Sequence, residues 1–171
     1  MPRYIALLRG VSPMNCKMAE LKAAFESAGF TNVRTLLSSG NVAFDARSSA
    51  ESTLERKAEA AMQAALGRSF YTIVRSSQDL QALLAEDPYS ALGVPAATKR
   101  VVSFMRQAPQ PKVALPVGID GADILCVHGR EVLSAYVPSA DGPVFMRLIE
   151  KTFGKDITTR TWDTVRKCAA A

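Results

Sequence analysis

Short apolar runs and stretches of helical periodicity follow one another through the first 75 residues of the chain. Residues 3–8 form an apolar run typical of a buried strand, and strand-like runs return at residues 33–38, 42–44 and 70–75. Between them, apolar residues recur at helical spacing over residues 18–28 and 52–66. The order strand-helix-strand-strand-helix-strand is the split βαβ, or ferredoxin-like, arrangement. It predicts that the first and third strands lie side by side and antiparallel in the centre of a sheet.

The residues between these segments are typical of helix ends and turns. Asn15 suits the N-cap of the first helix, and Ser52 and Glu55 have the spacing of a capping box at the start of the second. Ser39-Gly40-Asn41 is typical of a tight turn that joins the second strand to the third. Gly67 is expected to end the second helix.

The second half of the chain is less regular. A helix is predicted over residues 77–86, a strand over 100–105, a hairpin over 124–137 around His128-Gly129, a helix over 143–153 and a strand over 157–160. A proline-rich connection precedes the hairpin, and Thr161 is expected to cap a short last helix. The predicted fold class is therefore α+β, with a ferredoxin-like subdomain at residues 1–76 and a second, ferredoxin-like α+β subdomain with extra C-terminal elements at residues 77–171.

Composition supports a folded protein in a reducing compartment. The chain has 171 residues, of which 48% are hydrophobic and 22% charged, as in ordinary globular domains. No apolar run approaches the length of a membrane span, and the first residues read as a strand and not as a signal peptide. The cysteines are odd in number and widely spaced (Cys16, Cys126 and Cys168), which favours the cytoplasm over a disulfide framework.

The net charge of +5 is concentrated at the two ends of the chain. Residues 1–75 hold ten basic and six acidic side chains, and residues 143–171 hold six and three. A basic surface attracts phosphate groups, but no dense run of Lys and Arg occurs. The expected partner is therefore a phosphate-bearing small molecule or a nucleic acid, and not a membrane.

One end of the predicted sheet gathers polar and small residues. In a split βαβ sheet, the end of the first strand, the start of the third and the start of the first helix lie at the same edge. This edge collects Arg9, Asn15, Lys17, Ser39, Gly40 and Asn41. A helix N-terminus offers unpaired N–H groups to an anion, and Arg9 or Lys17 adds a charge-assisted contact. The alternative is structural: the same residue types form caps, turns and surface ion pairs.

A second pair of candidates lies near the end of the chain. Trp162, the single tryptophan, is expected to anchor the last helix on the body of the protein. The alternative is that Arg160 and Trp162 present a guanidinium and an indole together to a planar or anionic ligand. The single histidine, His128, fits a hairpin turn. The sequence identifies no catalytic residue, cofactor or metal site, and its few sheet aromatics do not form an RNA-recognition pattern.

Motifs near both ends resemble those of a bacterial domain-of-unknown-function family, number 1697. They are Tyr4-Ile5-Ala6-Leu7-Leu8-Arg9-Gly10, Lys17-Met18-Ala19-Glu20-Leu21, Ser39-Gly40-Asn41-Val42-Ala43-Phe44 and Thr158-Thr159-Arg160-Thr161-Trp162-Asp163-Thr164-Val165. The resemblance implies two ferredoxin-like subdomains in a cytoplasmic bacterial protein, without an established activity. This chain departs from the family pattern in a shortened loop at residues 11–16, and in Thr161 and Asp163, which replace asparagines.

Three functions remain open from the sequence. The first is a non-enzymatic module that binds an anionic, phosphate-bearing ligand at the edge of Arg9 and Ser39-Gly40-Asn41. The second is an enzyme of unrecognised type whose site lies in the crevice between the subdomains. The third is a protein-interaction or scaffold protein. The first is preferred, because loops and turns supply hydrogen-bond donors while nucleophile–base and metal patterns do not occur in the sequence.

Overall fold

A computed structural model describes residues 1–95, 97–138 and 144–171 of the chain. The chain divides into two units, one formed by Met1–Ala85 with Arg166–Ala171 and the other by Glu86–Val165. We call them unit 1 and unit 2. Each unit contains its own antiparallel sheet, so the predicted α+β class with two βαβ-type subdomains is confirmed. No helix in the described ranges is long and apolar enough to cross a membrane.

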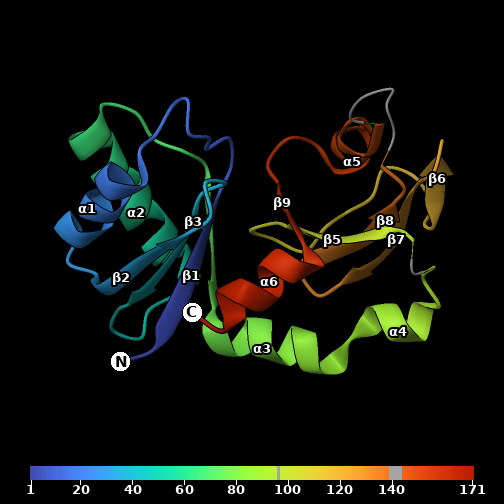
Figure 1. The fold of residues 1–171 in the computed structure, drawn as a ribbon, viewed down its shortest axis with the longest axis horizontal. Coiled ribbons are helices and arrows are strands. Elements are labelled where there is room, and N and C mark those ends of the chain that lie inside the picture. The colour runs from blue at the N-terminus through green and yellow to red at the C-terminus, as the bar shows by residue number, and fades with distance from the viewer. Residues whose placement is uncertain (96, 139–143) are drawn as a thin grey trace. The chain divides into compact units, whose positions relative to one another are not determined.

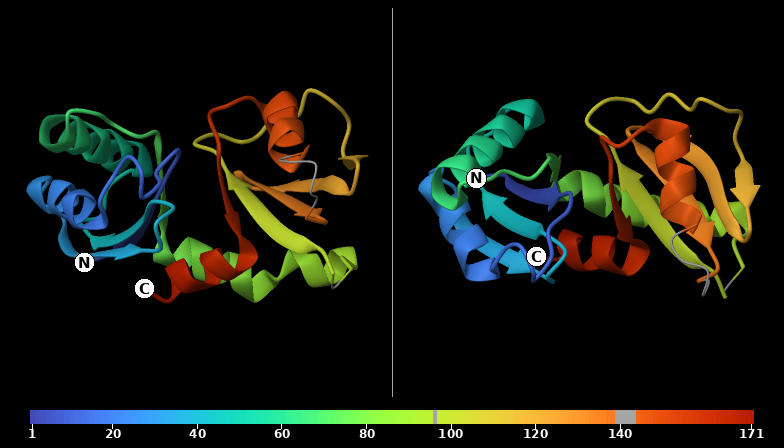
Figure 2. Two further views of the ribbon diagram at one scale, coloured as in Figure 1. Left: turned by 45° about the horizontal axis from the view of Figure 1, so that its top comes forward. Right: turned by 90° about the horizontal axis from the view of Figure 1, so that it is seen from above.

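Unit 1 contains the first four strands of the chain. They are β1 (Arg3–Leu8), β2 (Thr31–Leu36), β3 (Asn41–Asp45) and β4 (Thr72–Ser76). The strand order is β2-β3-β1-β4, and every neighbouring pair is antiparallel. The helices α1 (Met18–Ser27) and α2 (Glu51–Leu66) lie together on one face of the sheet (Figures 1 and 2). The predicted central pairing of the first and third strands is therefore confirmed.

The core of unit 1 explains why the sheet does not present aromatic side chains to solvent. Tyr4 and Phe44 stack with their ring centres 5.8 Å apart, and Phe30 stacks on Phe44 at 4.3 Å. All three belong to the apolar cluster between the sheet and its helices. On the opposite face of β1, Ile5 and Leu7 are also buried. Because both faces of β1 are buried, its aromatics have no role as an open RNA-binding surface.

Two predicted helix caps in unit 1 are wrong. The N-cap of α1 is Lys17 and not Asn15, and the N-cap of α2 is Ala50. Glu55 lies in the first half of α2, and its side chain is buried. Its carboxylate accepts a hydrogen bond from the Val74 backbone N–H of β4 at 2.9 Å. Glu55 therefore ties α2 to β4 and does not form a capping box. The expected stop at Gly67 is confirmed, since this residue has the left-handed backbone typical of a helix C-cap.

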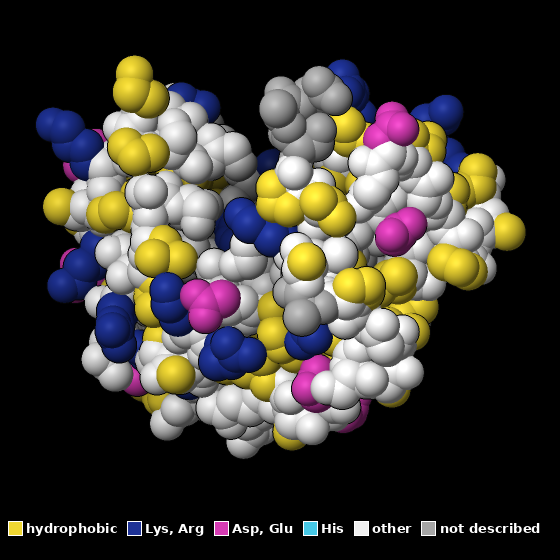
Figure 3. Space-filling view, turned by 45° about the vertical axis from the view of Figure 1, so that its right-hand side comes forward, with side chains coloured by type: hydrophobic (Ala, Val, Ile, Leu, Met, Phe, Trp, Pro, Cys, Tyr) yellow, Lys and Arg dark blue, Asp and Glu magenta, His cyan; other side chains and the backbone are white. Residues whose placement is uncertain are grey.

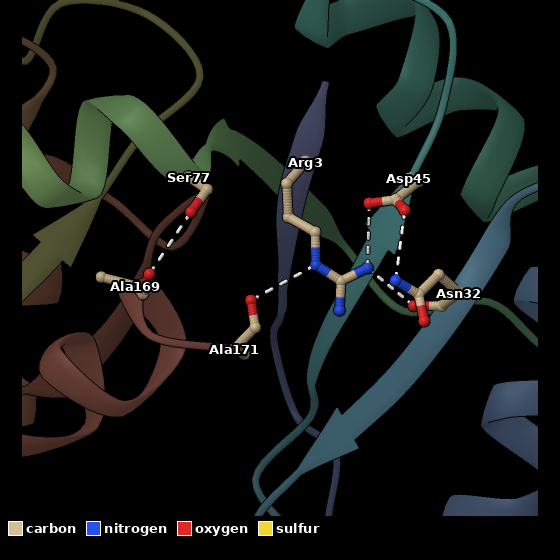
Figure 4. A network of polar contacts seen from close by, with 6 residues as sticks. All are labelled: Arg3, Asn32, Asp45, Ser77, Ala169 and Ala171. Atoms are coloured by element: carbon tan, nitrogen blue, oxygen red, sulfur yellow. Dashed lines mark hydrogen bonds and ion pairs between the residues drawn. The ribbon is translucent and has the colours of Figure 1, made fainter. Parts of the chain in front are cut away.

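A polar network ties the last residues of the chain into unit 1 (Figure 4). The Arg3 guanidinium donates to the Asp45 carboxylate at 3.0 Å, to the Asn32 carbonyl at 2.7 Å and to the Ala171 carbonyl at 3.3 Å. Desolvation raises the pKa of Asp45, but the hydrogen bonds from Arg3 and Asn32 and the Arg3 charge outweigh it and hold this pKa below its ordinary value. The Ser77 hydroxyl donates to the Ala169 carbonyl at 3.3 Å.

Unit 2 is built around a five-stranded sheet. Its elements are α4 (Pro88–Leu92), β5 (Lys99–Phe104), β6 (Val117–Ile119), β7 (Ala122–His128), β8 (Glu131–Tyr136), α5 (Val144–Phe153) and β9 (Thr158–Thr161). The helices α3 (Ser77–Glu86) and α6 (Trp162–Ala169) cross the division between the units. The sheet order is β6-β7-β8-β5-β9. Within it, β7-β8-β5-β9 repeats the order of β2-β3-β1-β4 in unit 1.

The first crossover of unit 2 differs from that of unit 1. Residues 105–116 contain no helix, although all of them are described, and they lead into the short edge strand β6. Three prolines in this segment explain this, because proline lacks the N–H that a helix interior needs: Pro109, Pro111 and Pro116. The sequence pattern predicted neither α4 nor β6.

The second crossover of unit 2 keeps its helix. Phe145, Leu148 and Ile149 of α5 face the sheet, as expected from their spacing. The expected start of this helix at residue 143 lies outside the described residues.

Candidate functional site

The end of β1 is held beside the β2–β3 turn by backbone contacts. The Leu8 N–H donates to the Gly40 carbonyl at 2.9 Å, and the Arg9 N–H donates to the Tyr71 carbonyl at 2.8 Å. Gly40 has a φ of +87°, and a Cβ at this position would lie 2.8 Å from the Cβ of Val11. Only glycine allows the turn to approach the chain after β1 so closely. The predicted gathering of Arg9 and the Ser39-Gly40-Asn41 turn at one sheet edge is therefore present.

Asn15 organises the loop between β1 and α1. Its side-chain carbonyl accepts a hydrogen bond from the Ser12 N–H at 2.9 Å, and its amide donates to the Gly10 carbonyl at 2.8 Å. These two bonds close the loop on itself, so Asn15 shapes the approach to α1 without capping it. The N-cap Lys17 is exposed and has an ammonium group that can donate but not accept hydrogen bonds. Among the described residues, α1 therefore begins without a side-chain capping bond from its N-cap.

Asn41 lies inside the turn and is fully buried. Its amide donates to the Leu36 carbonyl at 2.9 Å and to the Ser39 hydroxyl at 3.0 Å. Asn41 therefore closes the β2–β3 turn and orients Ser39, whose side chain is exposed. Of the predicted site residues, Arg9 is half-buried, and Asn15, Lys17 and Ser39 are exposed. We call these four residues, with Gly40 and Asn41, the β1-end site.

Arg160 and Trp162 belong to unit 2 and are both buried. One guanidinium nitrogen of Arg160 donates to the Thr158 hydroxyl at 2.7 Å and to the Thr159 carbonyl at 2.9 Å. The Trp162 ring meets the Tyr89 ring edge-on at 5.0 Å between centres. These contacts support the anchoring role for Trp162. They also show Arg160 bonded to its own strand, where its guanidinium satisfies acceptors of β9.

Tyr89, which packs against Trp162, has a structural role of its own. It is fully buried in α4, and its hydroxyl donates to the Val101 carbonyl of β5. Burial raises the pKa of Tyr89, so the phenol keeps its proton throughout the physiological range. A protonated phenol that donates to the backbone is a structural group. The sequence pattern did not single out Tyr89, because no motif distinguishes it from other isolated tyrosines.

Unit 1 also contains a hollow that the sequence pattern did not reveal. It has a volume of about 440 Å³ and lies between the start of α1 and the end of α2. Its lining comprises Asn15, Cys16, Glu20, Ala23, Ala24, Ala65, Leu66 and Arg68. Burial and, less strongly, Glu20 raise the pKa of the Cys16 thiol, while Arg68 acts in the opposite sense. This thiol is therefore protonated and unreactive near neutral pH. No set of three or more potential metal ligands occurs in the described ranges.

Basic side chains are dispersed on the face shown in Figure 3. Lys and Arg side chains stand there among uncharged groups and beside acidic ones, and they form no continuous basic surface. A protein that binds a nucleic acid along its backbone usually presents such a continuous surface. The face in Figure 3 does not show such a surface.

The fold is that of an α+β protein in which both units have the ferredoxin-like strand order. We call this shared four-strand arrangement the frame of each unit. The chain belongs to the family described as "Protein of unknown function (DUF1697)", whose model matches residues 1–132. Its structure is similar to that of the conserved bacterial protein SP0830 from Streptococcus pneumoniae, with a TM-score of 0.64 and 20% sequence identity. The match covers 99% of this chain and 97% of that protein, and at this identity it shows the fold alone. No curated protein matches the sequence.

Proposed function

We propose that the protein binds an anionic, phosphate-bearing ligand at the β1-end site. One observation supports this proposal above others: the Leu8–Gly40 backbone bond brings the β2–β3 turn to the point where β1 ends and the chain turns toward α1. Under this proposal Arg9 and Lys17 supply positive charge, and Ser39 supplies a hydroxyl. The start of α1 adds the partial positive charge of a helix N-terminus.

The residues of the β1-end site divide into two roles under this proposal. Arg9, Lys17 and Ser39 contact the ligand, with Arg9 as the principal charge-assisted donor. Asn15 and Asn41 shape the two loops through the hydrogen bonds they make inside the protein. Substituting Asn41 would therefore disturb the turn as well as any binding. Arg9 and Lys17 are the informative positions for a test.

Isothermal titration calorimetry with inorganic phosphate, ATP and a short oligonucleotide tests the proposal. We expect a phosphate-bearing ligand to bind, and the double substitution Arg9→Ala with Lys17→Ala to weaken binding at least about tenfold, because each charged hydrogen bond contributes about 1.5–3 kcal/mol. Arg106→Ala, after the matching strand of unit 2, is the control and should bind as the unaltered protein does. Equal affinity of the double variant and the unaltered protein would refute the site.

The three probes also separate ligand classes. A small phosphate ligand should bind in preference to the oligonucleotide and show a shallow salt dependence, because few phosphates are contacted. Preferential binding of the oligonucleotide, with a steep loss of affinity at higher salt, would indicate a nucleic acid instead. If none of the probes binds, the proposal fails.

A further inference from the structure

The hollow between α1 and α2 is separate in its chemistry from the β1-end site. Small side chains create it: Ala23, Ala24 and Ala65 line the space where larger residues would fill the groove between the two helices. Its volume of about 440 Å³ falls within the range of small-molecule sites. Asn15 is the one residue that the hollow shares with the β1-end site.

Two opposite charges stand on different elements of this hollow. Glu20 comes from the first turn of α1, and Arg68 follows the end of α2. Both act electrostatically on the Cys16 thiol, with opposite effects on its pKa, so both are close to the same wall. In the described ranges, neither Glu20 nor Arg68 forms an ion pair. The hollow therefore offers an acidic and a basic group that are both available to a ligand.

Arg68 is also held in place. Its guanidinium carbon lies 4.7 Å from the centre of the Phe70 ring, within the range of a cation–π interaction. This contact limits the conformations of an otherwise exposed side chain, so less entropy is lost when it binds a carboxylate. The contact leaves the guanidinium edge available for hydrogen bonds in its own plane.

We propose that this hollow binds a small zwitterion, of the size of a short peptide, with its carboxylate on Arg68 and its ammonium group on Glu20. The alanine side chains accommodate the uncharged middle of the ligand, and the Asn15 side chain adds a polar contact at the rim. A ligand with only one of the two charges leaves the opposite protein group unpaired as water is displaced. The hollow should therefore discriminate against it.

A titration with triglycine, followed by ¹H–¹⁵N correlation spectra, tests this proposal. Triglycine carries both charges and no side chains. We expect saturable shifts at residues 15–24 and 65–68 below about 10 mM. N-acetyltriglycine and triglycinamide, which each lack one charge, should bind at least fivefold more weakly. The proposal is overturned if triglycine gives no saturable shift, if the shifts lie elsewhere, or if either blocked peptide binds as tightly.

Three variants define the site further. Glu20→Gln and Arg68→Gln should each weaken triglycine binding, and Ala23→Leu should abolish it by filling the hollow from an exposed helix position. Arg9→Ala should leave triglycine binding unchanged, so failure of the β1-end site and failure of this site are distinguishable. Binding that survives all three substitutions in the hollow would refute the assignment.

Discussion

The two sheets share a strand order but differ in the segment that comes after their first strand. In unit 1, the Leu8 N–H donates to Gly40 in the β2–β3 turn at 2.9 Å; in unit 2, the Met105 N–H donates to Arg130 in the β7–β8 turn at 3.3 Å. The first strand therefore ends against a hairpin turn in both frames. After β1 the chain closes a short loop and begins α1, whereas after β5 it continues through residues 105–116 without a helix.

This difference shows which part of the frame could bind a ligand. The contact between strand end and hairpin turn occurs in both units, so the Leu8–Gly40 bond supports a site only together with the helix start that follows β1. A helix follows the first strand only in unit 1, where its start adds backbone N–H groups and partial positive charge. We therefore expect anion binding at the end of β1 and not at the end of β5.

The largest predicted effect is a loss of folding stability. It comes from substituting the residue at which the last strand of a unit leads directly into a helix. Trp162 follows β9 and Ser77 follows β4, and both are buried. Trp162→Ala should destabilise the protein by about 3–5 kcal/mol, because it removes a large ring packed on Tyr89. Ser77→Ala loses only a 3.3 Å hydrogen bond and should cost about 1 kcal/mol. Urea unfolding followed by circular dichroism measures both, and equal losses would contradict the anchoring role of Trp162.

A smaller difference in folding stability is expected between glycine-to-alanine substitutions in the two hairpin turns. Gly40 and Gly129 both have positive φ, so alanine is strained at either position. At Gly40 a new Cβ would also meet Val11 at 2.8 Å, whereas at Gly129 the nearest atom is a Glu131 carboxylate oxygen at 3.5 Å. Gly129→Ala should cost about 1 kcal/mol and Gly40→Ala about 1–3 kcal/mol more. Thermal melts of the two variants make the comparison, and a Gly129 variant as unstable as the Gly40 variant would contradict it.

The smallest effect concerns the pH dependence of unit 1. The pKa of Asp45 is lowered in the folded protein, so its stabilising contribution is present above its ordinary value of 3.8 and is lost as pH falls through the folded value. Asp45→Asn should reduce stability by less than about 1 kcal/mol at pH 6, as for other partly exposed ion pairs. The difference between the variant and the unaltered protein should shrink toward pH 3. Denaturant melts at both pH values measure the difference in unfolding free energy between the two proteins. A difference that grows toward pH 3 would contradict the lowered pKa of Asp45.

Much of the fold could be predicted from the sequence because the apolar periodicity is strong in unit 1. The β1–β3 pairing follows from the order of elements and the handedness of crossovers. The N-caps predicted for α1 and α2 were wrong because Asn15, Ser52 and Glu55 have cap-like types without acting as caps, whereas Thr161 caps α6 as predicted, accepting a hydrogen bond from the Thr164 N–H at 3.2 Å. Asn15 bonds to Ser12 and Gly10, and Glu55 bonds to the Val74 backbone. Such partners leave no local sequence signal.

The candidate site could be predicted only as a set of positions. Chain topology was enough to bring Arg9 close to the turn around Gly40. Whether a side chain faces solvent or the interior depends on packing: Asn41 and Arg160 are buried and bonded within the protein, although their residue types suggested ligand contacts. The hollow between α1 and α2 depends on three alanines from two distant segments. Because these alanines meet only in the folded protein, no short sequence motif could predict the hollow.

A titration with inorganic phosphate, monitored by ¹H–¹⁵N correlation spectra, tests the central claim most directly. The amides at the end of β1, in the loop to α1 and in the Gly40 turn should shift in a saturable way, because the proposed site would donate hydrogen bonds to a bound phosphate. The amides of residues 105–106 and 128–130, at the matching end of unit 2, should remain unchanged. Saturable shifts of equal size at both ends, or at neither, would contradict an anion site that depends on the start of α1.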